Sequence, residues 1–325
     1  MSITTQTNLP SLEELPDTFL VSLENYSAIS LKGDEQTSYL QGQVTCDVNN
    51  SNDNNLHIGA HCNAKGKVFS VFRLINRNSA HLLIQPKASI CGSISELKKF
   101  GVFAKVDITP TDELSFIALV GEQAVDFLQD NFNKIPDSLT PVVQSNTTTL
   151  VYIAGKQARY LLIDENQVLD KTVSKFKLPI YQSSVWNLLE IQEGFPQLSN
   201  ASSSEYVPQM LNLQAINGIS FTKGCYLGQE TVARMQYLGK NKRALFSLKT
   251  QLTQPLEDDD IIEKQLGENW RKAGDILTKY QSDDGHCFLQ AVLNSDLDNS
   301  TVLRIKSQPE SVVIVQTLPY SLIAE

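Results

Sequence analysis

Apolar and polar residues alternate near the start of the chain in a way that predicts a strand followed by a short helix. Residues 17–31 alternate as a half-buried strand does, and Gly33 and Asp34 end the run. Asp34 can serve as the N-cap of a helix that reaches Leu40, and Gly42 follows as its end. The chain is therefore predicted to open with a strand, a turn and a helix.

A β-hairpin and a second helix are predicted next. Residues 68–75 and 80–85 are apolar stretches separated by a short polar turn, as in a hairpin. Residues 93–100 have the pattern of a helix, and Gly101 is positioned to end it. Hairpins and helices therefore occur together in this part of the chain.

The alternation of strands and helices continues to about residue 190. Residues 185–191 are apolar on both sides, so periodicity leaves strand and helix open there. The remaining patterns predict strands at 102–108, 114–120, 148–154 and 160–163, and helices at 122–132 and 168–176. Such an order predicts an α+β body of mixed sheets and helices.

Helical patterns end near residue 243. Short strands separated by turn residues follow, and they are expected at 244–248, 274–280, 287–293, 302–305 and 311–316. Several short strands in so few residues suit a small β-barrel, which closes its own edges. We therefore divide the chain into a body of two interleaved subdomains, residues 1–242, and a carboxy-terminal barrel, residues 243–325.

Composition and charge argue against several classes of function and location. The chain has 325 residues, of which 41% are hydrophobic, and a formal net charge of −9. An acidic protein is not expected to coat nucleic acid, although residues 231–256 contain basic residues and no acid. Met1 to Pro10 lack the features of a secretory signal, and the apolar runs are too short to span a bilayer. We expect a cytoplasmic protein.

The cysteines do not predict a disulfide framework or a metal site. There are five of them, widely spaced and without a Cys-x-x-Cys pair, and the four histidines add no ligand pattern. Cys225 alone stands in an unusual setting, between Gly224 and Gly228 and next to the cationic Lys223. Such a thiol is either a small packed residue or a reactive group whose thiolate Lys223 favours.

The segment around Cys225 closely resembles a motif of the YgfZ family. The matching string is Lys-Gly-Cys-Tyr-Leu-Gly-Gln-Glu at residues 223–230, followed by Val-Ala-Arg at residues 232–234. Two earlier segments, residues 40–47 and 64–67, also look like family segments, and the likeness extends from about residue 18 to residue 322. Three motifs in the right order make the resemblance specific.

The resemblance implies a body folded like the glycine-cleavage T-protein, with a tetrahydrofolate cavity and a barrel beside it. It also implies a role in maintaining iron–sulfur enzymes and in the thiolation of some tRNAs. Cys225 would be the functional thiol, assisted by Lys223. The implied cofactor-binding residues are Tyr26, Trp186, Gln192, Gln229, Glu230 and Arg234, and no metal ligand is implied.

Three features of this chain depart from the pattern of the family or of the T-proteins, and they limit which residue roles the resemblance implies. Tyr26 stands where relatives commonly have tryptophan, and Gln192 stands where they have a glutamate that would face the pterin. Glu190 or Glu193 could supply that carboxylate instead. The paired aspartates of true aminomethyltransferases have no counterpart in residues 65–72, which contain no acid, so we expect no aminomethyltransferase activity.

The sequence leaves three functional hypotheses. The first is a folate-dependent accessory factor with Cys225 as its working thiol. The second is a one-carbon transferase that acts on tRNA or protein, guided by basic residues 234–249. The third is an interaction protein that docks an iron–sulfur carrier near Cys225 and residues 240–243. Iron–sulfur proteins and tRNA-modifying enzymes are the expected partners, and direct tRNA binding stays open.

Overall fold

The computed structural model describes residues 4–237, 239, 241–297 and 300–322, and it contains three β-sheets. The first body sheet has the strand order β11-β1-β7-β10-β9-β8. Its strands are β1 (Thr18–Ser22), β7 (Leu114–Gly121), β8 (Val142–Ser145), β9 (Thr148–Ile153), β10 (Arg159–Glu165) and β11 (Ile180–Tyr181). Only the pairing of β1 with β11 is parallel among these described strands.

The second body sheet is antiparallel and has the order β3-β4-β5-β2-β6. Its strands are β2 (Tyr26–Lys32), β3 (His57–Cys62), β4 (Val68–Arg77), β5 (Ala80–Pro86) and β6 (Asp107–Pro110). The chain thus begins in the first sheet with β1, builds the whole second sheet, and returns to the first sheet with β7.

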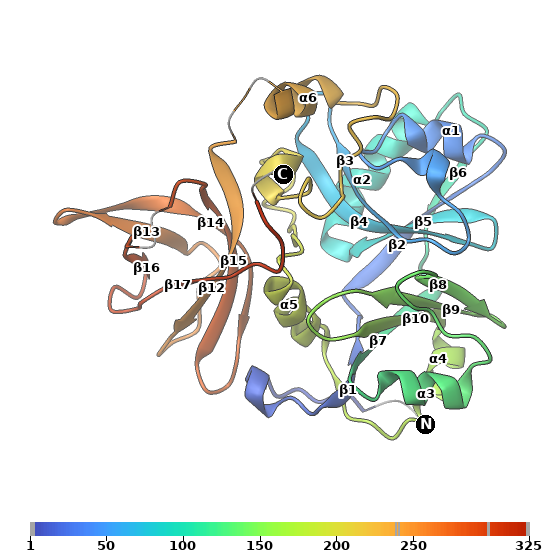
Figure 1. The fold of residues 1–325 in the computed structure, drawn as a ribbon, viewed down its shortest axis with the longest axis horizontal. Helices are drawn as coiled ribbons and strands as arrows, with labels where there is room; N and C mark the ends of the chain where they lie inside the picture. Colours follow the sequence, from blue (N-terminus) through green and yellow to red (C-terminus); the bar gives the residue numbers. More distant parts are fainter. Residues whose placement is uncertain (1–3, 238, 240, 298–299, 323–325) are drawn as a thin grey trace.

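The third sheet lies on the carboxy-terminal side and curls into a barrel (Figure 1). Its order is β16-β13-β14-β15-β12-β17, and the backbone N–H of Val313 donates to the carbonyl of Leu303 at 3.0 Å. This bond joins the two ends of the sheet, which removes free edges. The strands are β12 (Arg243–Gln251), β13 (Ile261–Leu266), β14 (Asn269–Gln281), β15 (His286–Asn294), β16 (Leu303–Ile305) and β17 (Ile314–Gln316).

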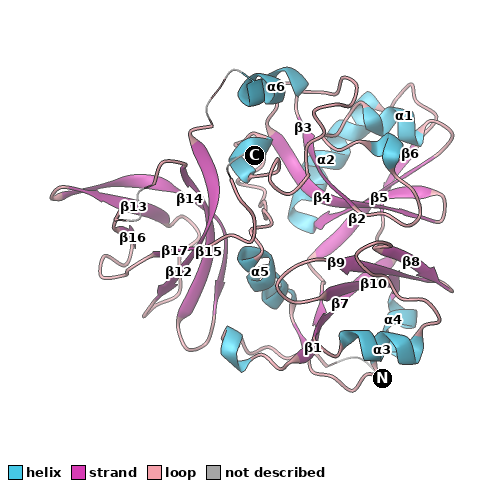
Figure 2. Cartoon of the chain, viewed as in Figure 1, coloured by secondary structure: helices cyan, strands magenta, loops and turns pink. Residues whose placement is uncertain are grey.

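The helices cover the two body sheets, and one of them lies between the body and the barrel (Figure 2). That central helix is α5 (Ser183–Gln192), which contacts β1, β14 and β15. The others are α1 (Gln36–Gln41), α2 (Lys87–Phe100), α3 (Ala124–Asn131), α4 (Asn166–Val173) and α6 (Gln229–Tyr237), with 3₁₀ turns at Leu12–Glu14, Val48–Asn50 and Pro208–Leu211. No helix in the described residues is long and apolar enough to cross a membrane.

The predicted fold class is confirmed, because an α+β body carries a carboxy-terminal curled sheet. The hairpin turn lies at Asn78 and Ser79, which both have positive φ angles, and Gly42 and Gly101 end their helices as expected. The uncertain segment 185–191 is helical. Its seven residues include six that are buried, because α5 is enclosed by other elements on nearly all sides.

Some local predictions were wrong. Residues 17–31 form two strands of different sheets, β1 and β2, since the chain turns between Ser22 and Tyr26. Glu35, not Asp34, occupies the N-cap position of α1, and neither its side chain nor another caps the helix there. The strand expected at residues 102–108 is confined to β6, which begins at Asp107.

The division into residues 1–242 and 243–325 stays a prediction. The barrel's first strand begins at Arg243, but the chain after β17 returns to the body. There the hydroxyl of Tyr320 donates to the carbonyl of Gly194 at 2.7 Å. The segment before β1 also reaches the barrel, where the hydroxyl of Tyr280 donates to the carbonyl of Pro10 at 2.6 Å.

Candidate functional site

A fully buried carboxylate, Glu190 of α5, lies where the three sheets meet. Each of its oxygens forms an ion pair with an arginine. Arg73 Nη2 of β4 is 2.9 Å from Oε2, and Arg159 Nη1 of β10 is 2.6 Å from Oε1. Gln197 Nε2 donates to Oε2 at 3.2 Å. A charge removed from water must be paired in this way, because unpaired burial costs several kcal/mol.

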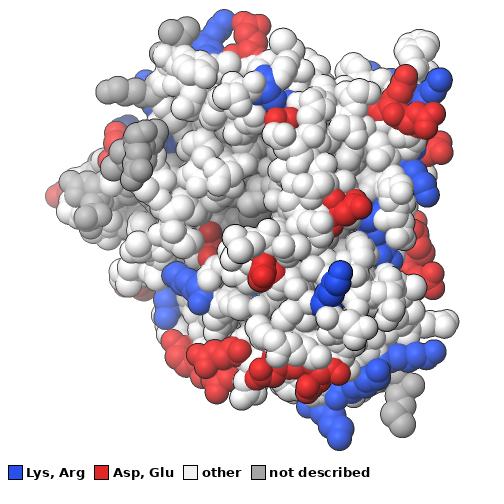
Figure 3. Space-filling model, turned by 45° about the vertical axis from the view of Figure 1, so that its right-hand side comes forward, with Lys and Arg blue, Asp and Glu red and all other residues white. Residues whose placement is uncertain are grey.

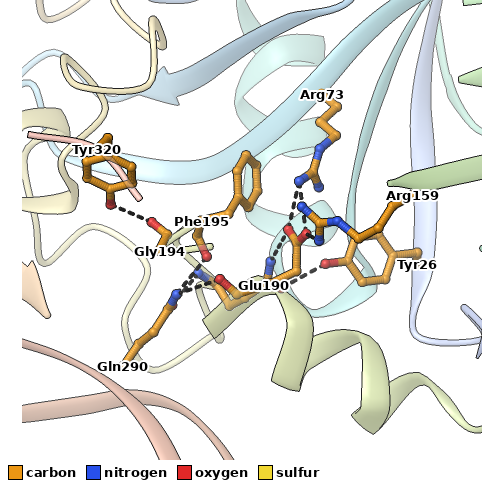
Figure 4. A network of polar contacts seen from close by, with 9 residues as sticks. Tyr26, Arg73, Arg159, Glu190, Gly194, Phe195, Gln290 and Tyr320 are labelled. Atoms are coloured by element: carbon orange, nitrogen blue, oxygen red, sulfur yellow. Dashed lines mark hydrogen bonds and ion pairs between the residues drawn. The ribbon is translucent and has the colours of Figure 1, made fainter. Parts of the chain in front are cut away.

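Aromatic rings surround this ion pair (Figure 4). The guanidinium of Arg73 lies 3.8 Å from the ring centroid of Phe195, and that of Arg159 lies 4.9 Å from the ring centroid of Trp186. The hydroxyl of Tyr26 donates to Gln197 Oε1 at 2.8 Å. Burial, followed by the negative charge of Glu190, raises the pKa of Tyr26 well above its ordinary value, so this phenol is neutral and acts as a donor.

The barrel is joined to the same network through Gln290 of β15. Its Nε2 donates to the carbonyls of Glu190 at 3.3 Å and Phe195 at 2.8 Å, and its Oε1 accepts from the backbone N–H of Gln197 at 3.2 Å. Gln290 is completely buried. A single polar network therefore connects β2, β4, β10, α5 and β15 (Figure 4).

A cavity of about 250 Å³ opens beside Tyr26. A larger groove of about 750 Å³ shares several wall residues with it, including Ala88 and Leu277. The lining of the small cavity includes the polar residues Asn25, Tyr26, Lys87, Asn187 and Gln197. The groove is acidic, with Glu205, Glu257, Asp258, Asp259, Asp260 and Asp275 in its lining and Lys279 as its one cation among the described residues.

The lining of the cavity beside Tyr26 matches part of the expected folate. A pterin has amide-like edges, which the carboxamides of Asn25, Asn187 and Gln197 match, and Lys87 can balance a carboxylate. Trp186 Nε1 and Arg159 Nε are buried donors without a hydrogen-bond partner within the described chain, but neither residue lines this cavity. The residues beside Tyr26 therefore fit a pterin, but the cavity alone is smaller than the ~300 Å³ at the lower end of ligand pockets.

Trp186 does not offer the stacking face that the resemblance implied. Its side chain has no exposed surface, and the guanidinium of Arg159 lies near its ring. Tyr26 is 5% exposed and borders the cavity. Of these two aromatic residues, Tyr26 is the one that a ligand in the cavity would touch.

Gln192 lies in a different place. It lines a cavity of about 200 Å³ together with Lys156, Phe288 and Gln316, between α5 and the barrel. Asn187, which lines the cavity beside Tyr26, is more than one helical turn away on α5. The two cavities are therefore separate in their lining residues, and Glu190 occupies the helix between them.

The motif at residues 223–230 lies against the second body sheet. The backbone N–H of Leu227 donates to the carbonyl of Gly42 at 3.0 Å. Gly228 has a φ of +83°, and a Cβ there would be 2.4 Å from the carbonyl oxygen of Asn63. Only glycine suits that position, because the backbone of Asn63 and Gly66 approaches it closely. Gly224 differs: its φ is outside the left-handed region and nothing lies within 4 Å of an added Cβ.

Lys223 is directed into the protein. Its Nζ donates to the carbonyls of Val44 at 2.8 Å and Cys46 at 2.6 Å, and the residue is 8% exposed. Burial lowers the pKa of this amine to about 8. Lys223 therefore holds the motif loop, residues 223–228, against the segment before β3. Cys225, two residues later, is exposed.

Of the other candidate residues, Glu230 and Arg234 are at the surface and Gln229 is partly buried, whereas Tyr226 of the same motif is buried. Glu230 and Arg234 of α6 form an exposed ion pair at 2.9 Å, with 86% and 69% of their side chains exposed, and Gln229 begins the helix. The cavities beside Tyr26 and Gln192 and the acidic groove are not lined by Cys225. The structure thus places the predicted residues in three locations: the central network, the Gln192 cavity, and the motif surface.

The other thiols differ from Cys225. Cys46, Cys62 and Cys287 are buried, and burial raises the pKa of each. Cys91 of α2 is exposed, as Cys225 is. In the described part of the chain, no three His, Cys, Asp or Glu side chains are grouped so that they could hold a metal ion.

Sequence reasoning missed Arg73, Arg159, Gln197 and Gln290. A signal was present, because Arg73 stands inside an apolar strand, Arg159 begins one, and Glu190 stands between Leu189 and Ile191. Charged residues in apolar runs are buried only when paired. Which residues pair could not be read from the sequence, since they come from separate elements.

Comparisons with known proteins agree with the fold described above. Residues 241–308 match the family model described as "YgfZ, beta-barrel domain". The tRNA-modifying protein YgfZ of Colwellia psychrerythraea is 66% identical over 325 residues, which is 100% of both chains. The protein of the same name from Yersinia enterocolitica is 40% identical over 311 residues, 95% of this chain and 94% of that one.

A solved structure is similar in fold. The glycine cleavage system aminomethyltransferase T of Bartonella henselae aligns with a TM-score of 0.70 and 13% sequence identity. The alignment covers 93% of this chain and 86% of that one. At this identity the likeness concerns the architecture alone.

Proposed function

Since this chain belongs to the YgfZ family, we propose that it is a folate-binding accessory protein that supports the modification of some tRNAs. Its full-length relatives are named tRNA-modifying proteins, which supports the tRNA half of the proposal. We extend it to the thiolation of tRNA and to the maintenance of iron–sulfur enzymes in the cytoplasm. A bound reduced folate would supply a carrier for one-carbon units.

The folate half rests on the cavity beside Tyr26. Tyr26 supplies an aromatic wall, Asn187 and Gln197 supply donors and acceptors, and Lys87 supplies a positive charge. The neighbouring groove is acidic, so the carboxylates of a folate tail would be repelled from it and favoured near Lys87. This polar, partly aromatic cavity is the single observation that carries the cofactor proposal.

The assignment of a functional thiol rests on the exposure of Cys225. The thiol is carried on a loop that Lys223 fastens through two hydrogen bonds, so it is held out toward solvent on a fixed support. A side chain in that setting can meet a macromolecular partner. We therefore assign Lys223 a positioning role and Cys225 the role of the functional thiol.

A titration with tetrahydrofolate tests the cofactor half. Wild-type protein is expected to bind with heat release, and Tyr26→Ala and Lys87→Ala are expected to weaken binding about tenfold or more, the size of one lost hydrogen-bonded or charged contact. Cys225→Ala is the matched control and should bind as the wild type does. The absence of binding by folded wild-type protein would refute the cofactor proposal.

Aminomethyltransferase activity is not part of the proposal. Residues 65–72 contain no acid, and none of the wall residues of the Tyr26 cavity is a carboxylate among those described. The electrostatic partner for an amine under attack is therefore missing from this cavity. A turnover assay that supplies methylene-tetrahydrofolate, ammonia and a dithiol acceptor is expected to give no product.

The exposed position of Cys225 also favours a second candidate, an interaction protein that docks an iron–sulfur carrier. Lys242 and Arg243 are exposed near the start of the barrel, while Lys240 lies outside the described residues. The face in Figure 3 shows Lys and Arg interspersed with Asp and Glu and no continuous basic surface over its described residues. Mixing with a cluster-loaded carrier separates the candidates, because only docking predicts a complex that Cys225→Ala weakens.

A further inference from the structure

The acidic groove lies between the body and the barrel, beside the cavity at Tyr26. Its volume is about 750 Å³. The body contributes lining residues within 199–206 and Ala88 of α2, and the barrel contributes residues 257–260 and part of β14. Ala88 and Leu277 line both the groove and the cavity, so the two spaces adjoin. A molecule in the groove would therefore contact both the body and the barrel.

The negative charge of this groove is largely uncompensated. Six of its lining residues are acidic, and Lys279 is the one cation in the lining among the described residues. Lys279 pairs with Asp258, and Asp275 pairs with Lys272 outside the lining. Three exposed carboxylates form no hydrogen bond or ion pair within the described part of the chain, those of Glu205, Glu257 and Asp259. Like charges held this close repel one another, so the groove suits a positively charged molecule.

A buried phenol in the wall supplies a second, independent feature. Tyr206 lines the groove, is 7% exposed, and packs its ring in an apolar cluster. Its hydroxyl forms no hydrogen bond with any described residue. Burial, followed by the negative charge of Asp275, raises the pKa of Tyr206 to about 12; Arg243 acts against this shift and Glu205 adds to it. The hydroxyl therefore lies near carboxylates of the groove and is a protonated donor without an acceptor.

The composition of the wall favours a polypeptide as the positively charged molecule. Apolar residues also line the groove, with Ile261, Ile276 and Leu277 on the barrel side and Ala88 on the body side. Lysine and arginine combine an apolar stem with a cationic head, which suits such a mixed wall. The free donor of Tyr206 matches a main-chain carbonyl, which a peptide supplies and a simple amine does not. Nucleic acid is disfavoured, because the carboxylates repel phosphates.

From these observations we propose that the acidic groove is a docking site for a lysine- or arginine-rich segment of a partner protein. The cationic heads pair with the free carboxylates of Glu205, Glu257 and Asp259, and a main-chain carbonyl accepts from the hydroxyl of Tyr206. The segment lies across the body and the barrel, next to the proposed folate cavity. Docking here requires no bound folate and leaves Cys225, which does not line the groove, free for another contact.

Fluorescence anisotropy of a labelled peptide tests this docking site. The probe is a short peptide of alternating arginine and alanine that carries fluorescein, and the full-length protein without folate is titrated into it. We expect saturable binding, and no binding of the same peptide with glutamate in place of arginine. Failure of folded wild-type protein to bind the arginine peptide would overturn the proposal. Because no folate is present, the result is independent of the proposed cofactor.

Two double variants with the same net charge distinguish the groove from the protein surface as a whole. Glu257→Gln/Asp259→Asn removes two free carboxylates of the groove and should weaken peptide binding about fivefold or more. Asp126→Asn/Asp130→Asn makes the same change in charge at exposed positions of α3 outside the lining, and should alter binding by less than about twofold. Equal weakening by the two variants would show that the peptide responds only to net charge, which would overturn the proposal.

The contact of Tyr206 with the main chain is tested by removing its hydroxyl. Tyr206→Phe keeps the ring in its apolar cluster and should weaken binding of the arginine peptide about threefold or more, the size of one lost hydrogen bond. An unchanged affinity would overturn this contact.

Competition with spermidine tests the choice of a polypeptide. Spermidine is cationic but has no carbonyl, so we expect it to displace the peptide only at a much higher concentration than unlabelled peptide does. Displacement at equal concentrations would identify the groove as a polyamine site and overturn the assignment to a partner protein.

Discussion

At the scale of single residues, Glu190 determines how the centre of the molecule is organised. A carboxylate with no exposed surface is held by Arg73 and Arg159, which come from different sheets. The charges compensate one another, so the site is stable only as a set. Tyr26 and Gln197 extend this set to the edge of the cavity.

Replacing Glu190 tests this dependence. Glu190→Ala leaves two buried guanidinium groups unpaired, and we expect a loss of about 3–5 kcal/mol in the free energy of unfolding. Urea unfolding monitored by tryptophan fluorescence measures it. Glu230→Ala is the matched control, because its pair with Arg234 is exposed and such pairs contribute about 0–1 kcal/mol. Similar losses in the two variants would contradict the account.

Two buried histidines predict a specific pH dependence of stability. Burial lowers the pKa of His61 from 6.5 to about 4, and burial together with the nearby His57 lowers that of His81 to about 4. Because the folded-state values are lower, the unfolded state binds more protons between these limits. Stability from these groups is present above pH 6.5 and is lost as the pH falls toward 4.

The measurement is the unfolding midpoint of wild type and His61→Gln across that window. The variant should show a shallower decline between pH 6.5 and 4, because one of the three histidines with a lowered pKa, His57, His61 and His81, is gone. Parallel curves for the two proteins would show that His61 does not take up its proton on unfolding.

At the scale of elements, the motif loop is defined by how closely it approaches the sheet. Gly228 meets Asn63 and Gly66, Lys223 meets Val44 and Cys46, and α6 starts immediately afterwards. Gly66 and Gly228 both have positive φ angles. The loop therefore presents Cys225 on a backbone that is held on both sides.

The two glycines flanking Cys225 give opposite predictions. Gly228→Ala places a methyl group against backbone atoms in a left-handed conformation, so it should destabilise the protein by about 2 kcal/mol or more. Gly224→Ala meets nothing within 4 Å and should change stability by less than about 1 kcal/mol. Thermal unfolding of the pair measures the difference. Equal effects would contradict the description of the loop.

How far the sequence predicts the fold also depends on the element. The hairpin of β4 and β5 and the helix ends at Gly42 and Gly101 followed from local patterns and turn residues. α5 could not be assigned, because a helix enclosed on nearly all sides has no polar face. The split of residues 17–31 into β1 and β2 depends on long-range pairing with β7 and β5, which no local pattern contains.

The site shows the same limit. The motif at residues 223–230 was evident from the sequence, but the packing of Gly228 against Asn63 and Gly66 was not. The surroundings of Cys225 and Trp186 depend on the tertiary arrangement, and Trp186 is enclosed while Cys225 is exposed. The direction of Lys223 was equally hidden, since its acceptors lie nearly 180 residues earlier in the chain.

At the scale of the whole molecule, three sheets share one core. A single hydrophobic cluster includes Phe19 of the first sheet, Ile84 of the second and Phe288 of the barrel, and it encloses Trp186. The polar network of Glu190 and Gln290 lies within this junction (Figure 4). The cavity beside Tyr26 is therefore built at a meeting point of separate sheets, where ligand sites are common.

The central claim is that a reduced folate binds in the cavity beside Tyr26, and a crystal structure of the protein with tetrahydrofolate tests it most directly. The account predicts density for the pterin within hydrogen-bond distance of Asn187 or Gln197, against the ring of Tyr26. Density confined to the cavity at Gln192 or to the surface at Cys225, or none at a saturating concentration, would contradict it.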